Sequence, residues 1–318
     1  MSPNPKTAAG QSGSPSAGSR SRDRLSKVLL GILLVAAGIL AGLLLSGGMR
    51  KIYAWYLLQI VPPVLGLLSL IIIGIFALVR RRWSRAILAT LVVSLLAILP
   101  ALMMVFPVGF PASAAHMTPA ATVRLPADVP LQVIWGGDGL AHNRHIVSPD
   151  QRWAYDFLVT PYFSGSTRPE DYGCYGVPVV APASGLVTDA HDGEPDAIPG
   201  AVSNNYSAPK GNYVVIQLET GTYLVIAHLK PGSVAVAAGE HVTEGQQIGQ
   251  CGNSGNTSEP HIHIHHQRQD PSVYPLGFAE GLPLYFRDHD GPAMPEGGYR
   301  IEGQQAIPLG PVVQHLGD

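Results

Sequence analysis

The sequence predicts a membrane α-helical N-terminal part with three transmembrane helices, followed by an all-β antiparallel domain outside the cytoplasm. The chain of 318 residues is 46% hydrophobic and only 13% charged, about half the charged share that is usual in soluble proteins. This imbalance is concentrated before residue 108, where three long apolar runs occur. After residue 131, short β-type segments alternate with Gly, Pro and Asn, a pattern that favours antiparallel sheets.

The N-terminal part is expected to span a membrane. Residues 1–24 are rich in Ser, Gly, Pro and Ala and predict a disordered cytoplasmic tail. The apolar runs at 28–46, about 56–79 and about 86–106 are each long enough to cross a bilayer, which takes about 20 apolar residues. A cleaved signal peptide is the alternative for the first run, but that run is long and two more follow it. We therefore expect a three-helix transmembrane region at 25–107.

The basic residues predict the orientation of this region. They are concentrated in the leading tail (Lys6, Arg20, Arg22, Arg24 and Lys27) and in the second loop (Arg80, Arg81, Arg82 and Arg85), whereas the first loop has only Arg50 and Lys51. The positive-inside rule places the N-terminus in the cytoplasm, so three crossings of the inner (cytoplasmic) membrane leave the C-terminal domain in the periplasm. The net charge of −2 and the lack of a basic stripe exclude nucleic acid as the main partner.

The C-terminal part is expected to consist of a Pro/Ala-rich linker at 108–130, a β domain at 131–287 and a Gly/Pro-rich tail at 288–318. The predicted strands are 131–135, 153–159, 178–181, 185–190, 213–218, 223–228, 241–243, 261–265 and 282–286. No amphipathic helix is expected after residue 108.

The two cysteines of the chain, Cys174 and Cys251, both lie in the outside domain, where disulfides form and persist. A bridge between them would brace the Gly/Asn/Ser-rich loop that follows Cys251. We expect this disulfide, and two unpaired buried thiols are the alternative.

One segment of the β domain reads His-Ile-His-Ile-His. A strand sends alternate side chains to opposite faces, so Ile262 and Ile264 are expected to face a core while His261, His263 and His265 share the other face. Residues on one face lie about 6–7 Å apart, so two of these imidazoles can serve one metal centre. An accidental His-rich face or a metal-storage tract is the alternative, but storage tracts do not alternate with Ile.

Three more positions carry side chains that suit a metal site. Asp156 lies in an apolar segment between two aromatic residues, where a carboxylate is costly unless it is paired or binds a metal. His145 lies one loop upstream, and His228 ends an apolar strand. The structural alternatives are a buried hydrogen-bonding carboxylate for Asp156 and a satisfied strand-end histidine for His228.

Taken together, these motifs resemble the M23 (lysostaphin/LytM-type) zinc metallopeptidases over about residues 131–267. The motifs, which occur in family order, are Asn143-Arg144-His145, Tyr155-Asp156-Phe157, Ala227-His228-Leu229, Gly252-Asn253-Ser254-Gly255 and Pro260-His261-Ile262-His263. The resemblance implies an antiparallel β-sheet peptidase domain and cleavage of peptide bonds in bacterial peptidoglycan.

The resemblance also implies roles for single residues. His145, Asp156 and His263 match the ligands of one Zn²⁺ per chain. His228 and His261 match the two catalytic histidines.

The chain departs from the family pattern in one place. Ten residues separate His145 from Asp156, whereas many members have three residues at this point. His142 is therefore the alternative first ligand. The sequence assigns no role to His265 and His266.

The expected function is that of a membrane-anchored zinc endopeptidase, with peptidoglycan peptides and the lipid bilayer as partners. The alternative is a non-catalytic LytM-like binding or regulatory module of the cell envelope. Whether a regulatory envelope partner controls the protein is left open by the sequence. A lipoyl-like carrier is a third interpretation, but its lysine would have to be Lys210, which lies in a Gly/Pro loop. The chain has no HExxH or GxSxG motif, which argues against a helical zinc protease and a serine hydrolase.

Overall fold

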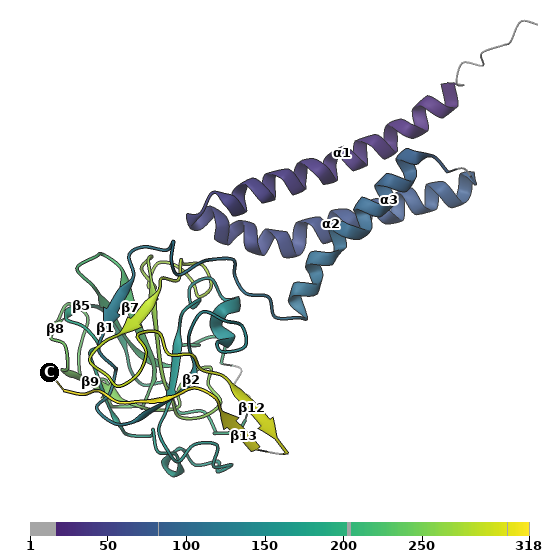
Figure 1. Ribbon diagram of the computed structural model, residues 1–318. Coiled ribbons are helices and arrows are strands. Elements are labelled where there is room, and N and C mark those ends of the chain that lie inside the picture. Colours follow the sequence, from purple (N-terminus) through teal and green to yellow (C-terminus); the bar gives the residue numbers. More distant parts are fainter. Residues whose placement is uncertain (1–16, 82, 202–204, 304, 318) are drawn as a thin grey trace, which may run out of the picture. The chain divides into compact units, whose positions relative to one another are not determined.

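The structure is a computed structural model that describes residues 17–81, 83–201, 205–303 and 305–317. The chain divides into two units, Met1–Phe106 and Pro107–Asp318. The first unit is helical and the second is built from β-strands (Figure 1).

Within the described part of the first unit, three helices are long and apolar enough to cross a membrane. They are α1 (Ala17–Leu45), α2 (Gly48–Arg80) and α3 (Arg85–Ile98), and α3 is continued by the 3₁₀-helix η1 (Leu99–Met104). Ser84 caps α3, because its side chain accepts a hydrogen bond from the Ile87 amide at 3.3 Å. The three predicted apolar helices are thus confirmed.

Two helix boundaries differ from the prediction. Helix α1 begins at Ala17, so residues 17–24 of the expected tail are helical, while 1–16 lie outside the described residues. Helix α2 begins at Gly48 rather than near residue 56. Nothing in the run 49–55 ends a helix, since it contains neither Gly nor Pro.

The helices of the first unit pack closely through small and apolar residues. Ile73 and Ala77 of α2 form a buried cluster with Ile87 of α3. A Cβ added at Gly66 would lie 2.6 Å from the carbonyl oxygen of Ser94. A larger residue at position 66 would therefore force α2 and α3 apart.

The second unit is organised around one eight-stranded sheet in the described residues. Its strand order is β14-β2-β3-β10-β7-β6-β5-β8, and every neighbouring pair is antiparallel. In that order the strands are Val312–Val313, Leu131–Trp135, Tyr155–Leu158, Ile262–Gln267, Tyr223–Leu229, Asn212–Gln217, Gly185–His191 and His241–Val242. The predicted antiparallel β domain is therefore confirmed.

Three small sheets complete the described part of this unit. They pair β4 (Pro178–Val180) with β9 (Gln247–Gln250), β1 (Ala121–Val123) with β11 (Leu284–Phe286), and β12 (Tyr299–Glu302) with β13 (Gln305–Pro308). Only the β1–β11 pair is parallel. Helical structure among the described residues after 107 is limited to the 3₁₀ turns η2 (Arg144–Val147) and η3 (Pro169–Asp171), in keeping with the prediction of no amphipathic helix.

The register of β10 agrees with the predicted alternation. Ile262 lies opposite Phe157 of β3, and Ile264 lies opposite Ile226 of β7. All four side chains are at most 1% exposed and belong to the main apolar core. The histidines between them therefore emerge on the other face, as their alternation requires.

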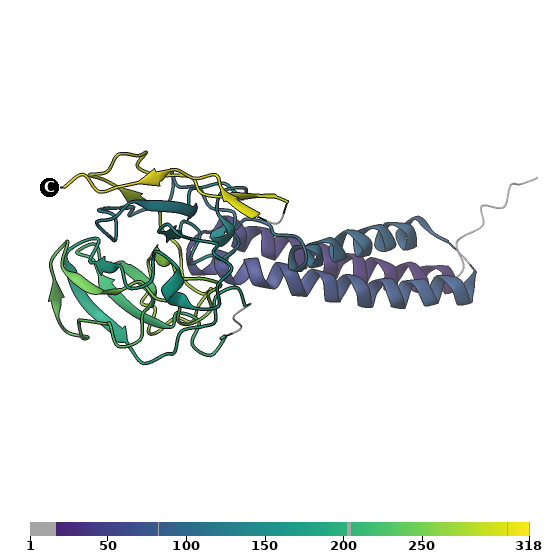
Figure 2. The same ribbon diagram turned by 90° about the horizontal axis from the view of Figure 1, so that it is seen from below.

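The C-terminal residues contribute to the fold, contrary to the expectation of a simple tail at 288–318. Strand β14 pairs with β2 at the edge of the large sheet, and its Val313 is fully buried. Strands β12 and β13 form a hairpin near β2 (Figures 1 and 2). The expected linker at 108–130 likewise contains β1. These strands are two to four residues long, which is too short for sequence periodicity to reveal them.

Cys174 and Cys251 form the predicted disulfide. Their Cα atoms are 5.7 Å apart and they are separated by 77 residues along the chain. On the chain-entropy model, closing a loop of this length stabilises the fold by about 4–5 kcal/mol. Because Cys251 directly precedes the Gly/Asn/Ser-rich loop, the bridge holds one end of that loop against the sheet.

Candidate functional site

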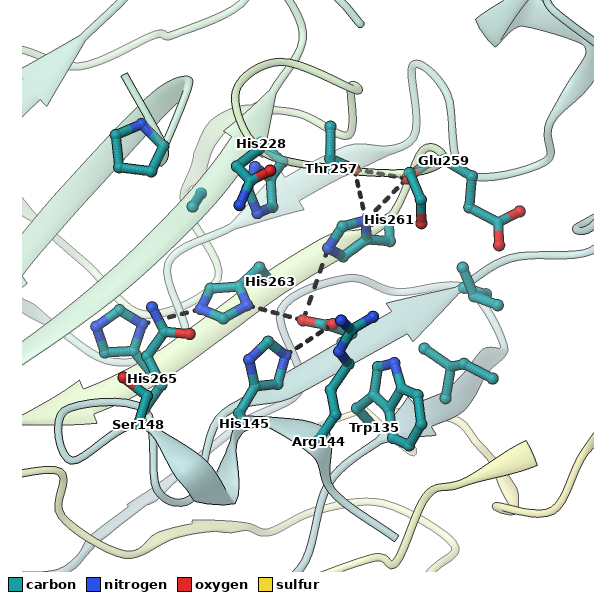
Figure 3. A pocket seen from close by; sticks show the side chains of 18 of the residues that line it. Trp135, Arg144, His145, Ser148, His228, Thr257, Glu259, His261, His263 and His265 are labelled. Carbon is teal, nitrogen blue, oxygen red and sulfur yellow. Dashed lines mark hydrogen bonds and ion pairs between the residues drawn. The ribbon is translucent and has the colours of Figure 1, made fainter. Parts of the chain in front are cut away.

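A cavity of about 680 Å³ lies over the neighbouring strands β3, β10 and β7. Its lining includes all of the side chains singled out as metal-binding or catalytic, together with one further histidine. They are His145, Asp156, His228, His261, His263 and His265. Figure 3 shows how five of the six, all histidines, converge from different elements of the unit.

Asp156 is the centre of this group. The antiparallel register places it directly opposite His263 of the neighbouring strand β10. Its Oδ1 lies 2.7 Å from His263 Nδ1, and its Oδ2 lies 2.8 Å from His145 Nε2. The three ligand atoms lie within 4.8 Å of one another, which is close enough to hold one metal ion. The structure thus brings together the three side chains that the sequence singled out as ligands.

His145 reaches Asp156 from the turn η2, which a buried asparagine holds in place. Asn143 accepts a hydrogen bond from the His145 amide at 3.0 Å. Its amide nitrogen donates to the carbonyl oxygens of Gly137 and Ala154, both at 3.1 Å. The ten residues between His145 and Asp156 therefore form an anchored turn, and the longer spacing still brings the imidazole to the carboxylate.

His142, the alternative first ligand, lies outside this group. Its Nδ1 donates to the carbonyl oxygen of Gly297 at 3.1 Å, and its Nε2 lies 3.6 Å from a carboxylate oxygen of Glu296. The geometry therefore favours His145 as the partner of Asp156.

His228 sits at an irregularity near the end of β7. The β6–β7 pairing shifts between Asn212 and Val214, so that Ala227 and His228 together face a single residue of β6. His228 takes a φ of 63°, a conformation that costs a side-chain-bearing residue about 1–2 kcal/mol. Its Nδ1 donates to the Ser254 carbonyl oxygen at 2.8 Å. The bulge turns a residue at the end of an apolar strand into a lining residue of the cavity.

His261 is held in a similar way. Its Nδ1 lies 2.8 Å from the Glu259 carbonyl oxygen and 3.2 Å from the Thr257 hydroxyl. A carbonyl oxygen only accepts hydrogen bonds, so Nδ1 carries the ring proton and Nε2 is the other available nitrogen. His228 Nδ1 also faces a carbonyl oxygen, that of Ser254, so it carries the ring proton for the same reason. The two rings are 4.8 Å apart, and His261 Nε2 lies 3.6 Å from Asp156 Oδ1.

The loop 252–260 supplies both of these carbonyl oxygens. A Cβ at Gly252 would lie 2.3 Å from the Lys230 nitrogen, so the loop lies directly on the chain that leaves β7. Ser254 Oγ donates to the Leu229 carbonyl oxygen at 2.7 Å and accepts from the Asn212 amide at 2.9 Å. The loop is therefore tied to the strand ends, and it fixes the two imidazoles that it contacts.

Burial and the neighbouring histidines shift the pKa values of Asp156, His228 and His263. Burial alone would raise the pKa of Asp156, but the charges of His145 and His261 and hydrogen bonds from the site histidines lower it well below the usual value of 3.8. Burial, together with His261 and His263, lowers the pKa of His228 well below 6.5. Burial also lowers the pKa of His263. An ionised Asp156 beside a neutral His263 is the protonation state in which these two side chains can bind a metal.

A chain of hydrogen bonds behind His263 fixes its tautomer. Gln267 Nε2 donates to the Gln269 carbonyl oxygen at 2.6 Å, so Gln267 Oε1 accepts from His265 Nε2 at 3.1 Å. A neutral His265 then offers Nδ1 as an acceptor, and His263 donates its Nε2 proton to it at 2.9 Å. A neutral His263 therefore turns an unprotonated Nδ1 toward Asp156 Oδ1.

This arrangement fits a bound cation. Two acceptor atoms, His263 Nδ1 and Asp156 Oδ1, face each other at 2.7 Å, and a cation between such atoms removes their repulsion. Imidazole nitrogens with one carboxylate oxygen suit Zn²⁺ better than Ca²⁺ or Mg²⁺, which prefer oxygen ligands. The residues present therefore fit zinc.

The last two histidines of β10 serve different purposes. His265 belongs to the hydrogen-bonded chain behind His263, a role that the spacing along the strand permits but does not specify. His266 points to the opposite face, where it bonds to Thr222 Oγ1 at 2.7 Å and to the Pro283 carbonyl oxygen at 3.2 Å. Burial lowers the pKa of His266 to about 4. His266 thus belongs to the packing of the domain rather than to the cavity.

The role of His265 can be tested through metal affinity. Replacing it by phenylalanine keeps a ring but removes the acceptor for His263, so the tautomer of His263 is no longer fixed. We expect zinc affinity to fall by about 10–100-fold, the usual effect of losing an outer hydrogen-bond partner. Competition titration with a chromophoric chelator measures this change. In His265→Asn the Oδ1 atom replaces Nδ1 as acceptor, and affinity should largely return; equal losses in both variants would contradict the role.

Comparison with known proteins gives one family match. Residues 171–275 match the model of Peptidase family M23. The matched segment contains His228, His261 and His263, whereas His145 and Asp156 precede it.

Three solved structures illustrate the similarity, and each is distant in sequence. The catalytic domain of the antimicrobial peptidase lysostaphin from Staphylococcus simulans is 23% identical, over 37% of this chain and 74% of that chain, with a TM-score of 0.25. A zinc-containing peptidase from Vibrio cholerae is 21% identical, over 46% of this chain and 36% of that chain, with a TM-score of 0.30. A mutant catalytic domain of the prophage-encoded M23 protein EnpA from Enterococcus faecalis is 16% identical, over 48% and 88%, with a TM-score of 0.31. The match confirms the predicted relationship to the M23 peptidases over residues 171–275, the segment that contains three of the five motifs.

Proposed function

We propose that this protein is a membrane-anchored zinc endopeptidase that hydrolyses peptide bonds of bacterial peptidoglycan. The observation that carries the proposal is the convergence of His145, Asp156 and His263, with their ligand atoms within 4.8 Å of one another. Two further imidazoles, His228 and His261, line the same cavity. The M23 family match over residues 171–275 supports peptidoglycan as the substrate class.

The proposed roles follow from the chemistry of the side chains. His145 Nε2, Asp156 and His263 Nδ1 would hold one zinc ion. When bound, this ion would polarise the scissile carbonyl and lower the pKa of a water molecule at the site toward about 7. His228 and His261 keep their Nδ1 protons on backbone carbonyls, so each presents Nε2 for orienting the water and for moving a proton. A donor placed at a developing oxyanion contributes about 3–4 kcal/mol to the barrier reduction.

The proposed location is the inner (cytoplasmic) membrane, with the N-terminus in the cytoplasm and the β unit outside it. Three apolar helices and the basic residues around them support this orientation. The buried disulfide supports an oxidising compartment for the β unit. Alkaline phosphatase fused after Asp318 should therefore be active, and an inactive fusion protein of normal abundance would contradict the placement.

The function is tested with the full chain in detergent micelles and purified peptidoglycan. The zinc-loaded protein should release new amino groups, because each hydrolysed peptide bond yields one amine. Treatment with a chelator should abolish the release, and added zinc should restore it. Binding to peptidoglycan without new amines from a zinc-loaded chain would overturn the peptidase and favour the non-catalytic module.

A further inference from the structure

Arg144 is a cation at the cavity that the proposed chemistry does not use. It immediately precedes His145 and belongs to the turn η2 that Asn143 anchors. Its side chain is exposed and contributes to the lining of the cavity. Figure 3 shows Arg144 and Trp135 next to each other, on the same side of the cavity as His145. Arg144 therefore forms a solvent-exposed part of the lining of the proposed peptidase site.

No carboxylate within the described residues neutralises Arg144. Its guanidinium has no ion pair there, and its contact with the chain is with an aromatic ring: Cζ lies 5.9 Å from the centroid of Trp135. Lys210 also lines the cavity, but its Nζ lies 3.7 Å over the ring of Tyr213, closer to its aromatic partner than Arg144 is to Trp135. A planar guanidinium supported by an aromatic ring keeps its donor fork free for a carboxylate.

A second aromatic side chain, Tyr299, lies beside Trp135, and these two rings are called the aromatic wall below. Tyr299 packs edge-on against Trp135, with ring centroids 5.2 Å apart, and remains 42% exposed. It starts the hairpin β12–β13, whose base is tied to β2 by a hydrogen bond from the Gly298 amide to the Ile134 carbonyl oxygen at 2.7 Å. The positions of the two rings are therefore set by the sheet. Trp135, Arg144 and Tyr299 all lie outside the segment that matches the family.

We propose that Arg144, supported by Trp135 and Tyr299, binds a carboxylate of the substrate peptide, so that the site selects acidic peptides over neutral ones. This inference rests on the proposed peptidase function for the identity of the substrate. Charge complementarity carries the inference. Arg144 has no ion pair with a carboxylate among the described residues, and a peptide carboxylate matches its planar guanidinium in shape and charge. The aromatic wall contacts the apolar parts of the same peptide.

The test compares two forms of one substrate. Peptide fragments prepared from peptidoglycan are used either untreated or after conversion of their carboxylates to carboxamides. Binding is measured by calorimetry with the zinc-loaded full chain in detergent, in a His228→Asn background, which slows turnover so that the peptides are not consumed during the titration. We expect the untreated fragments to bind about tenfold more tightly, which corresponds to about 1.4 kcal/mol. In Arg144→Gln the two forms should bind equally, and Arg144→Lys should keep part of the preference.

A matched control is Arg300→Gln on the same hairpin. Arg300 is exposed and its Nε lies 2.7 Å from Glu302 Oε1, so this change should leave the tenfold preference intact. The inference is overturned if the unmodified site binds both forms equally, or if Arg144→Gln keeps the preference. Cleavage by the chain with His228 intact is scored separately. A carboxylate preference without cleavage would refute the proposed peptidase function but support the carboxylate site at Arg144. Cleavage without a carboxylate preference would support the peptidase function and refute the carboxylate site.

Discussion

Replacing His263 by alanine is expected to abolish zinc binding and, with it, the release of amines from peptidoglycan. His263 is the only side chain that contacts both Asp156 and His265 in the described site, at 2.7 Å and 2.9 Å. Loss of an outer partner costs about 10–100-fold in metal affinity, so loss of a ligand should cost more than about 100-fold. Elemental analysis of zinc per purified chain measures the first effect, and amine release measures the second.

The control for this variant is His241→Ala. His241 is exposed at the edge of the sheet in β8, so its removal tests whether any histidine affects zinc content. Circular dichroism separates loss of metal from loss of fold. A folded His263→Ala protein that retains one zinc per chain and normal activity would contradict the whole proposed ligand set. Asp156 and His145 are proposed to bind the same ion as His263.

The main features of this site follow from rules that act over a few residues. Alternation along a strand places Ile262 and Ile264 in the core, and the same rule requires His263 and His265 to share the opposite face. The cost of burying a carboxylate predicts a cationic or metal partner for Asp156, and the structure surrounds this side chain with imidazoles. Both features depend only on the local period of a strand and on the chemistry of one side chain, so they can be predicted from the sequence.

Other features depend on contacts between distant parts of the chain. The cavity position of His228 arises from a bulge against β6, which is produced by pairing and has no signature within β7. The choice between His142 and His145 depends on how Asn143 bonds to Gly137 and Ala154, on either side of the turn.

The C-terminal strands show the same limit for the fold. Strand β14 has only two residues, Val312 and Val313, and it is a strand because the edge of β2 is available to pair with it. Its partner lies roughly 180 residues earlier in the chain, far beyond the reach of any local pattern. A Gly/Pro-rich composition describes the turns around such strands but does not reveal the strands themselves.

Replacing His228 is expected to reduce turnover strongly while leaving the metal in place. Among the described residues, Asp156 forms ion pairs with His145, His261 and His263 but not with His228. The ring centroid of His228 lies 4.8 Å from that of His261 and 5.6 Å from that of His263. Burial, followed by the charges of those two neighbours, lowers its pKa well below 6.5, so it is neutral at pH 7 and able to take a proton. Losing a general base or an oxyanion donor typically costs about 10²–10⁴-fold in kcat.

The variant must respect the backbone of this position. Alanine at a φ of 63° is strained, whereas asparagine tolerates the left-handed region and its amide can still donate to the Ser254 carbonyl oxygen. We therefore expect His228→Asn to keep the fold, one zinc per chain and an unchanged affinity for peptide fragments, while kcat falls by about 10²–10³-fold. Steady-state kinetics with zinc analysis on the same preparation separates these quantities. The ring nitrogens of His228, His261 and His263 also lie within 4.8 Å of one another and could hold a metal ion. Loss of zinc in His228→Asn would therefore make His228 a metal ligand rather than a catalytic residue.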